Sequence, residues 1–302
     1  MTSLTQDIKN KLSNLNVLEK IIVINVIIFL FANTFGLLYS TKVTDSLIWL
    51  ELPSQFSELL YKPWSILSYA FVHYGFMHVL FNMFLLYIVA QWFVNLFSMK
   101  LALNIYLLGA ISGGLLFVLA YTLFPHVLGP SRLVGASASV RALLVFLCAY
   151  MPTKPIRFFT INLKLWHLGI GVVIIDFLGV LGGLKQPLIG NPGGNIAHLG
   201  GALLGYIYAK QLVEKGNDIG AWFEPFVTSI LNIFNTAGTG KKKKTNLRTV
   251  HKAKGKMGGY KKADFDAFNN QKQIDIILDK ISKSGYDSLT SEEKAFLFRA
   301  GK

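Results

Sequence analysis

Apolar runs of about twenty residues alternate with short polar segments along the first 215 residues of the chain. That length is what an α-helix needs to cross the hydrocarbon core of a bilayer. With charges, prolines and glycines as boundaries, we predict six spans, at residues 21–39, 75–97, 101–124, 134–151, 165–184 and 193–213. The pattern therefore predicts an all-α, polytopic membrane protein with a six-helix bundle over residues 21–213.

Composition and charge change this picture only at the C-terminal end. Hydrophobic residues make up 52% of the chain and charged residues 15%, below the roughly one quarter that soluble domains carry. From Ala237 onward there are 16 Lys or Arg and 7 Asp or Glu, so this segment holds +9 of the net +14. We interpret residues 214–270 as a basic flexible linker drawn to anionic lipid headgroups. No aromatic or fold motif accompanies the charge, so nucleic acid is not expected as a partner.

The distribution of Lys and Arg predicts the orientation. The N-terminal segment and the second and fourth connections hold seven of these residues, against four on the other side. By the positive-inside rule both termini are cytoplasmic. Residues 1–20 are expected to form a cytoplasmic interfacial segment, because Leu4, Ile8, Leu12 and Leu15 recur at helical spacing. Compactness and the lack of a transit-peptide composition favour a bacterial inner membrane.

The last 32 residues, 271–302, predict a small helical hairpin. Ile274, Ile277, Leu278 and Ile281 lie on one helical face, and Gly285 permits a turn. A capping box formed by residues 290–293 then opens a second short helix.

Strongly polar side chains inside the predicted spans are costly and therefore mark candidate functional residues. His78 and Asn82 lie one turn apart on the second span, Ser137 begins the fourth, and His198 lies on the sixth. These three spans run in the same direction, so the polar residues share a layer near the outer face. A stripe of small residues beside His198 predicts a closely packed neighbouring helix; it consists of Ala197, Gly201 and Gly205.

A serine and a histidine at one depth can perform nucleophilic acyl transfer, in which imidazole accepts the hydroxyl proton. Because no acidic residue is expected at that depth, a dyad of Ser137 and His198 is favoured over a triad. The side chains of His78 and Asn82, with the Ser137 backbone N–H, are suitable donors to an oxyanion. Each residue also has a structural interpretation: serines cap helices, and histidine and asparagine make interhelical hydrogen bonds.

Taken together, the motifs resemble those of the rhomboid family of intramembrane serine proteases. They are His73, just before the second span, with His78 and Asn82 inside it, Gly135-Ala136-Ser137 at the start of the fourth, and Ala197-His198-Leu199-Gly200-Gly201 in the sixth. The resemblance implies Ser137 as nucleophile, His198 as general base and an oxyanion site at His78 and Asn82. It also implies transmembrane proteins as substrates, cleaved near their outer ends without metal or cofactor.

Three residues depart from the family pattern or complicate it. Ala138 replaces a glycine, and its methyl group is expected to crowd the approach to the nucleophile. Ser139 is a rival nucleophile. Arg141 stands where rhomboids commonly carry an aromatic ring, and its charge would lower the basicity of a nearby imidazole.

Asp176 is the only acidic residue inside a predicted span. A buried guanidinium needs a partner, so we hypothesise that Arg141 pairs with Asp176, leaves His198 neutral, and that the pair modulates the site. The alternative to a protease is a catalytically inactive relative that binds transmembrane segments, an interpretation supported by Arg141 and Ala138.

Overall fold

The computed structural model describes residues 12, 14–39, 42–158, 161–185 and 190–236, with shorter stretches at 256–257, 260–261, 274, 277–278, 280–281, 286–290, 293–294 and 296–297. The chain divides into two compact units, Met1–Lys244 and Thr245–Lys302. Most of the predicted interfacial segment at 1–20, and the lysine-rich segment expected to meet anionic lipids, lie outside the described residues.

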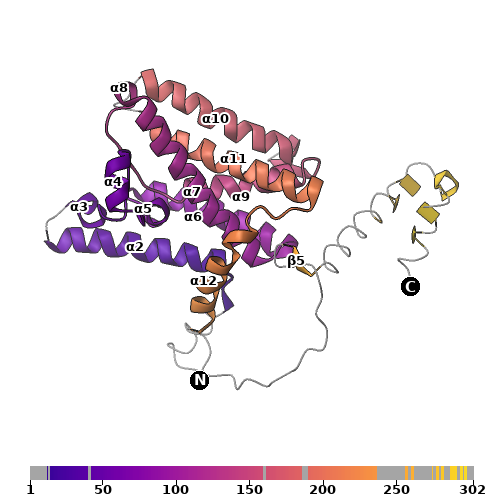
Figure 1. The fold of residues 1–302 in the computed structure, drawn as a ribbon. Coiled ribbons are helices and arrows are strands. Elements are labelled where there is room, and N and C mark those ends of the chain that lie inside the picture. The colour runs from indigo at the N-terminus through magenta and orange to yellow at the C-terminus, as the bar shows by residue number, and fades with distance from the viewer. Residues whose placement is uncertain are drawn as a thin grey trace. The chain divides into compact units, whose positions relative to one another are not determined.

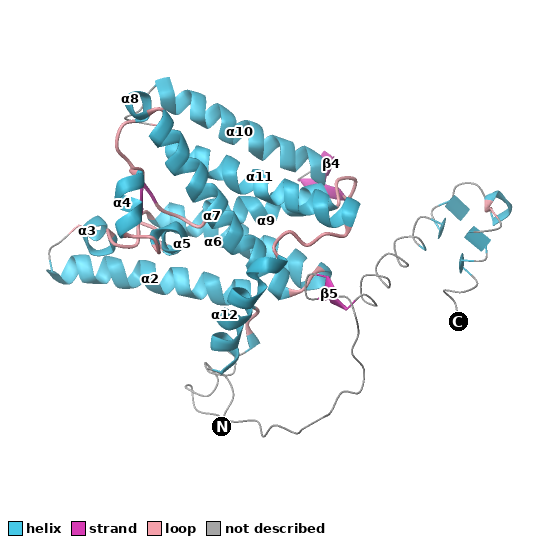
Figure 2. Cartoon of the chain, viewed as in Figure 1, coloured by secondary structure: helices cyan, strands magenta, loops and turns pink. Residues whose placement is uncertain are grey.

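The first unit is built from helices at all six predicted stretches (Figures 1 and 2). They are α2 (Val17–Tyr39), α6 (Phe76–Leu96), α7 (Met99–Leu123), α9 (Ser137–Tyr150), α10 (Leu165–Lys185) and α11 (Pro192–Lys215). Local chemistry explains several ends. Asn16 and Glu19 form reciprocal side-chain to backbone hydrogen bonds of 2.9 and 3.0 Å, so α2 begins four residues earlier than predicted. Gly216, at φ +61°, ends α11.

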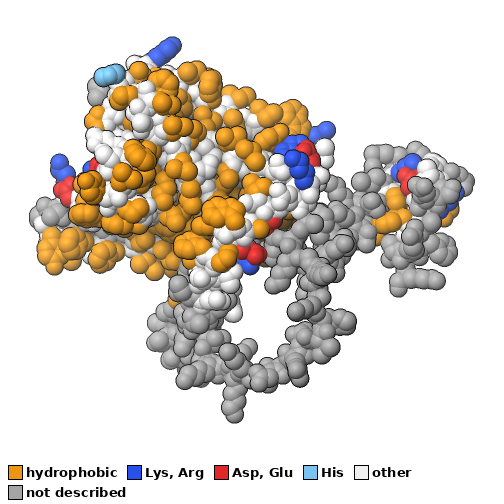
Figure 3. Space-filling view, viewed as in Figure 1, with side chains coloured by type: hydrophobic (Ala, Val, Ile, Leu, Met, Phe, Trp, Pro, Cys, Tyr) orange, Lys and Arg blue, Asp and Glu red, His pale blue; other side chains and the backbone are white. Residues whose placement is uncertain are grey.

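Four of the described helices are long and apolar enough to cross a membrane: α2, α6, α7 and α10. The helix α9 is apolar but has 14 residues, and α11 has 24 residues but is rich in glycine. Exposed apolar side chains cover much of the face shown in Figure 3. Phe31 on α2, Phe84 on α6 and Ile175 on α10 are more than half exposed. The chain is thus a mostly helical, multi-pass membrane protein.

The core lies around α7, α9 and α11, and in Figure 1 these helices lie between α2 and α10. In the apolar window of α7, 78% of residues are buried, against 17% in α10. A Cβ atom added at Gly201 would lie 2.0 Å from the carbonyl oxygen of Ala138, and one at Gly205 would lie 2.2 Å from that of Ala142. The close packing predicted from the small-residue stripe is confirmed, and the neighbour is α9.

Short elements connect the long helices. The segment before α6 contains α5 (Ser65–Ser68) and the 3₁₀ turn η1 (Tyr69–Phe71), which are separate from α6. Tyr69 is fully buried and donates to Ala110 of α7 at 2.7 Å. After α2 come α3 (Val43–Leu47), β1 (Leu52–Pro53) and α4 (Phe56–Tyr61), and after α7 come α8 (Pro125–Leu128) and β2 (Arg132–Leu133).

The all-α prediction is modified by three short antiparallel strand pairs. Leu52 pairs with Leu133 and Pro53 with Arg132, so β1 and β2 tie the connection after α2 to the one before α9. Strands β3 (Pro155–Phe158) and β4 (Ile161–Lys164) form a hairpin between α9 and α10. Isolated pairs of this length do not form a core, which remains helical.

The predicted linker at 214–270 is wrong in its first part. Residues Ala221–Phe223 form the 3₁₀ turn η2, and α12 (Glu224–Thr236) follows it. Val227 is fully buried, and Glu224 forms a 2.7 Å ion pair with Lys100 of α7. Apolar residues at helical spacing therefore extend the first unit beyond α11 before the basic segment begins.

In the second unit, Lys256–Met257 (β5) and Tyr260–Lys261 (β6) form the third strand pair, and Tyr286–Ser288 form a 3₁₀ turn, η3. Ile274, Ile277, Leu278 and Ile281 are helical, as the hairpin prediction requires. Thr290 and Glu293 form the predicted capping box, with hydrogen bonds of 2.8 and 3.2 Å. Lys280 pairs with Glu293 at 2.8 Å and so joins the two helical parts.

Candidate functional site

A glycine turn leads into α9 and is held from two sides. Gly135 has φ +117°, a conformation that L side chains rarely adopt, and its N–H donates to Tyr69 O at 2.9 Å. The next N–H, of Ala136, donates to Nε2 of His73 at 3.3 Å. The segment before α6 therefore supports the backbone that presents Ser137.

His73 is a functional candidate that we did not single out from the sequence, although it belongs to the quoted motif. Its side chain is fully buried, and its ring centroid lies 4.9 Å from that of His78. Its Nε2 atom accepts the backbone N–H of Ala136, so this nitrogen carries no proton and the ring is neutral. A neutral imidazole can accept the N–H of Ala136, and His73 thereby positions the turn.

Ser137 and Ser139 lie in different environments. Ser137 is the first residue of α9 and is partly exposed, whereas Ser139 is fully buried and packs against Gly109 of α7. Ala138 directs its methyl group toward Gly113 of α7, since a Cβ at Gly113 would lie 2.6 Å from it. The expectation that this methyl crowds the approach to Ser137 is therefore wrong, because the side chain after a helix's first residue points to a different face.

His78 and Ser137 border the same glycine. A Cβ at Gly135 would lie 2.7 Å from His78 Nε2 and 3.8 Å from Ser137 Oγ, so only a glycine leaves room for this ring. His78 also interacts electrostatically with His198. Asn82 is buried, and its side-chain N–H donates to the carbonyl of His78 at 2.9 Å. One amide hydrogen of Asn82 is thus used within α6.

His198 is partly exposed and lies on α11 where that helix meets α9 and α7. Its neighbour Ala197 has its carbonyl oxygen close to Gly113, and Gly201, one turn on, contacts Ala138. The hydrogen bond that His198 makes among the described residues goes to Asp176 rather than to Ser137. The backbones of α9 and α11 thus meet one residue from Ser137 and three residues from His198.

The predicted pairing of Arg141 with Asp176 is present. Arg141 Nε donates to Oδ2 of Asp176 at 2.8 Å, and Nη2 donates to Oδ1 at 3.3 Å. His198 Nδ1 lies 2.8 Å from the same Oδ1 atom. The expectation that no acidic side chain reaches the histidine is wrong. Asp176 lies nine residues before the end of α10, and His198 lies six residues after the start of α11. Because these helices are consecutive, the two side chains can meet.

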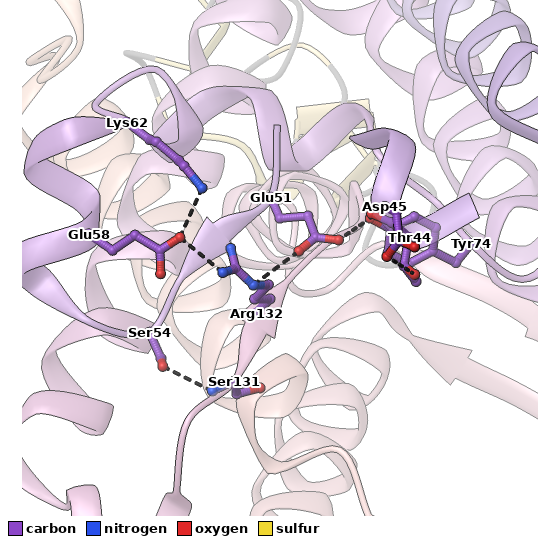
Figure 4. A network of polar contacts seen from close by, with 9 residues as sticks. All are labelled: Thr44, Asp45, Glu51, Ser54, Glu58, Lys62, Tyr74, Ser131 and Arg132. Atoms are coloured by element: carbon purple, nitrogen blue, oxygen red, sulfur yellow. Dashed lines mark hydrogen bonds and ion pairs between the residues drawn. The ribbon is translucent and has the colours of Figure 1, made fainter. Parts of the chain in front are cut away.

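A second polar cluster lies at the connection that precedes Ser137 (Figure 4). Arg132 contacts Glu58 at 3.0 Å and Glu51 at 3.5 Å, and Lys62 contacts Glu58 at 2.9 Å. The hydroxyl of Tyr74 donates to Glu51, and the backbones of Ser54 and Ser131 are joined in the same region. The hydrogen bond from Lys62, with support from Arg132, holds the pKa of Glu58 below its ordinary value. The cluster ties the segment after α2 to the loop that carries Ser137.

Replacing Arg132 with methionine is expected to lower the free energy of unfolding by about 2 kcal/mol, because Glu51 would remain as a buried carboxylate without its cation. Thermal unfolding in detergent measures this loss. The variant Lys210→Met, which breaks the exposed Lys210–Glu214 pair, is the control and should leave the free energy of unfolding nearly unchanged, because solvent screens that pair. Adding Glu51→Gln to Arg132→Met should recover most of the loss. Equal losses in Arg132→Met and Lys210→Met would contradict this account.

Comparison with protein families gives two matches. The Rhomboid domain profile matches residues 61–215, which is more than half of the chain, and includes α6 to α11. A second profile, described as Family of unknown function (DUF6576), matches residues 265–300 in the C-terminal unit. No curated protein matches the chain significantly. On the extent of the first match and the arrangement of its motifs, the chain belongs to the rhomboid family.

Proposed function

We propose that the protein is an intramembrane serine protease that hydrolyses peptide bonds of transmembrane substrates near the outer membrane face. Ser137 is the nucleophile and His198 the general base. The observation that carries the proposal is the close approach of α9 and α11 at Ala138 and Gly201, which brings together the helix positions of the two residues. The partial exposure of Ser137 and the burial of Ser139 support the choice of serine.

In the proposed reaction Ser137 Oγ attacks the scissile carbonyl carbon while Nε2 of His198 takes the hydroxyl proton. The tetrahedral oxyanion needs hydrogen-bond donors. The backbone N–H of Ser137, at the first position of α9, has no acceptor within the helix, and the side chains of His78 and Asn82 are nearby. His198 then returns the proton to the leaving amine, and water hydrolyses the acyl-enzyme. None of these steps requires a metal or cofactor.

The length of α9 supports a site below the outer surface. Fourteen residues span about 21 Å, which is less than the roughly 30 Å of hydrocarbon in a bilayer. If α9 ends at the cytoplasmic side, Ser137 lies inside the membrane, beneath a polar loop that gives water a path. We accordingly propose six crossings with both termini cytoplasmic, in a cell membrane. In this proposal α9 and α11 cross the membrane in the interior of the bundle, where the other helices separate them from lipid.

The substrate class follows from the same geometry. In an intact transmembrane helix the scissile carbonyl is hydrogen-bonded and shielded by side chains. A substrate must therefore unwind locally before Ser137 can reach it, and helices that carry residues with low helical propensity near their outer ends are the expected targets.

A catalytically inactive relative that binds transmembrane segments is the second candidate. It is favoured by the contact of His198 with Asp176 rather than with Ser137 and by the charge of Arg141. Catalytic hydrogen bonds are often loose without substrate and tighten in the complex, so this contact weighs less than the shared position of the two residues.

The test uses the full chain in liposomes, a single-span substrate and a fluorophosphonate that labels activated serines. We expect a defined cleavage product and one labelled residue, Ser137, identified by mass spectrometry of the digested protein. Label on Ser139 would move the nucleophile by two residues. Neither product nor label with several substrates, together with retained substrate binding, would establish the inactive relative instead.

A further inference from the structure

We infer that Asp176 is a positioning residue for His198, and that Arg141 offsets its charge, so that the proposed dyad acts as a triad with a neutralised acid. The inference rests on the proposed function. It begins from one carboxylate that contacts two partners: Oδ1 faces His198 Nδ1, and both oxygens face Arg141.

The tautomer of His198 follows from the chemistry of its partner. An ionised carboxylate only accepts hydrogen bonds, so Nδ1 of His198 carries the proton in the 2.8 Å contact with Asp176. Neutral imidazole then has an unprotonated Nε2, the form that can take a proton from Ser137. The Asp176 side chain is 2% exposed, and this burial restricts the carboxylate to one orientation.

Arg141 limits how strongly that carboxylate can stabilise imidazolium. Its guanidinium binds both oxygens and is 19% exposed, so solvent screens the pair weakly. The charge of Asp176 is then shared between Arg141 and the imidazole of His198. Asp176 therefore orients His198, while Arg141 offsets the negative charge beside the ring.

The remaining groups around His198 do not supply a competing charge. Asp176 of α10 contacts His198 directly, Arg141 of α9 binds the same carboxylate, and His78 of α6 interacts with His198 electrostatically. The helix α7 carries no charged side chain between Leu101 and Leu123, and its titratable residues there are Tyr106 and Tyr121. The balance between Arg141 and Asp176 therefore dominates the electrostatics of the ring.

Opposite shifts of the pH–rate profile test the inference. Arg141→Met leaves the carboxylate unpaired beside His198, which favours imidazolium, so the acidic limb of kcat/KM should move upward by about one pH unit. Asp176→Asn leaves the guanidinium unpaired, so the limb should move downward. In this variant the amide oxygen faces Arg141 and the NH₂ faces His198, which favours the wrong tautomer, so the maximal rate should fall about 10²- to 10⁴-fold.

The double variant Arg141→Met with Asp176→Asn releases the amide, which can turn its oxygen toward His198. The acidic limb of its kcat/KM profile should lie between those of the two single variants, and its maximal rate should exceed that of Asp176→Asn. A charge-swapped pair, Arg141→Asp with Asp176→Arg, keeps an ion pair but removes the acceptor from His198, and it should stay inactive. The rate of fluorophosphonate labelling of Ser137 against pH gives a second readout, independent of substrate binding.

The outcomes separate the two proposals. If wild type neither cleaves nor labels, the protease assignment and this inference both fail. If wild type is active and all variants keep its acidic limb, with rates that follow their unfolding temperatures, the Arg141–Asp176 pair is only structural and this inference alone is overturned. Opposite limb shifts in variants that unfold at similar temperatures would establish Asp176 as the positioning residue.

Discussion

Replacing Ser137 with alanine is expected to reduce cleavage of a single-span substrate by about 10⁴-fold or more. The Ser137 hydroxyl is the nucleophile that forms the acyl-enzyme in the proposed mechanism, and serine hydrolases without their nucleophile keep only the small rate contributed by binding and oxyanion donors. The protein should remain folded, because Ser137 is partly exposed and begins a helix whose N-cap, Ala136, makes no side-chain capping bond. Product formation by purified enzyme in liposomes measures the loss.

Ser139→Ala is the matched control, since it removes the same group two residues further along the same helix. Ser139 is fully buried against α7, away from the partly exposed turn at Ser137. We expect its activity to stay within about threefold of wild type, as for a mildly destabilising substitution. Loss of cleavage in Ser139→Ala with normal activity in Ser137→Ala would reassign the nucleophile.

Replacing Gly201 with alanine is expected to abolish activity through packing. The added Cβ would lie 2.0 Å from the carbonyl oxygen of Ala138, whereas side-chain Cβ atoms do not approach within 3.0 Å, so α9 and α11 must separate by about 1 Å. Backbone atoms on both sides of this contact cannot rotate away. We expect a loss of about 3 kcal/mol in the free energy of unfolding, and at least a 10²-fold loss of activity in the protein that remains folded.

The same substitution at glycines with open space around them controls for helix propensity. Gly171 and Gly182 lie on α10 with no atom within 4 Å of an added Cβ. Gly171→Ala and Gly182→Ala should be neutral or slightly stabilising, because alanine favours the helix. Gly205→Ala, with a 2.2 Å approach to Ala142, should resemble Gly201→Ala. Thermal unfolding and cleavage of the four variants, measured in parallel, test the account, and a stable, active Gly201→Ala would refute it.

Much of the first unit could be predicted from the order of residues. Hydrophobic runs located all six long helices to within a few residues, because the length of an apolar run and the residues that end it are local properties. The observed start of α2 lies before the predicted one, because the side chain of Asn16 caps the helix and hydropathy alone does not report such a cap. Residues 224–236 form a helix where a linker is predicted. The prediction followed the high charge of the basic segment after residue 236, although apolar residues recur at helical spacing before it.

Periodicity and charge are local properties of the chain, so they suffice to locate the helices, their order and the residue types available for chemistry. The contacts of those residues depend on how the helices pack. Asp176 reaches His198 as well as Arg141, the methyl of Ala138 packs against Gly113, and His73 supports the turn at Gly135. Each of these depends on the rotation and depth of one helix against another, and side chains from several helices jointly determine both.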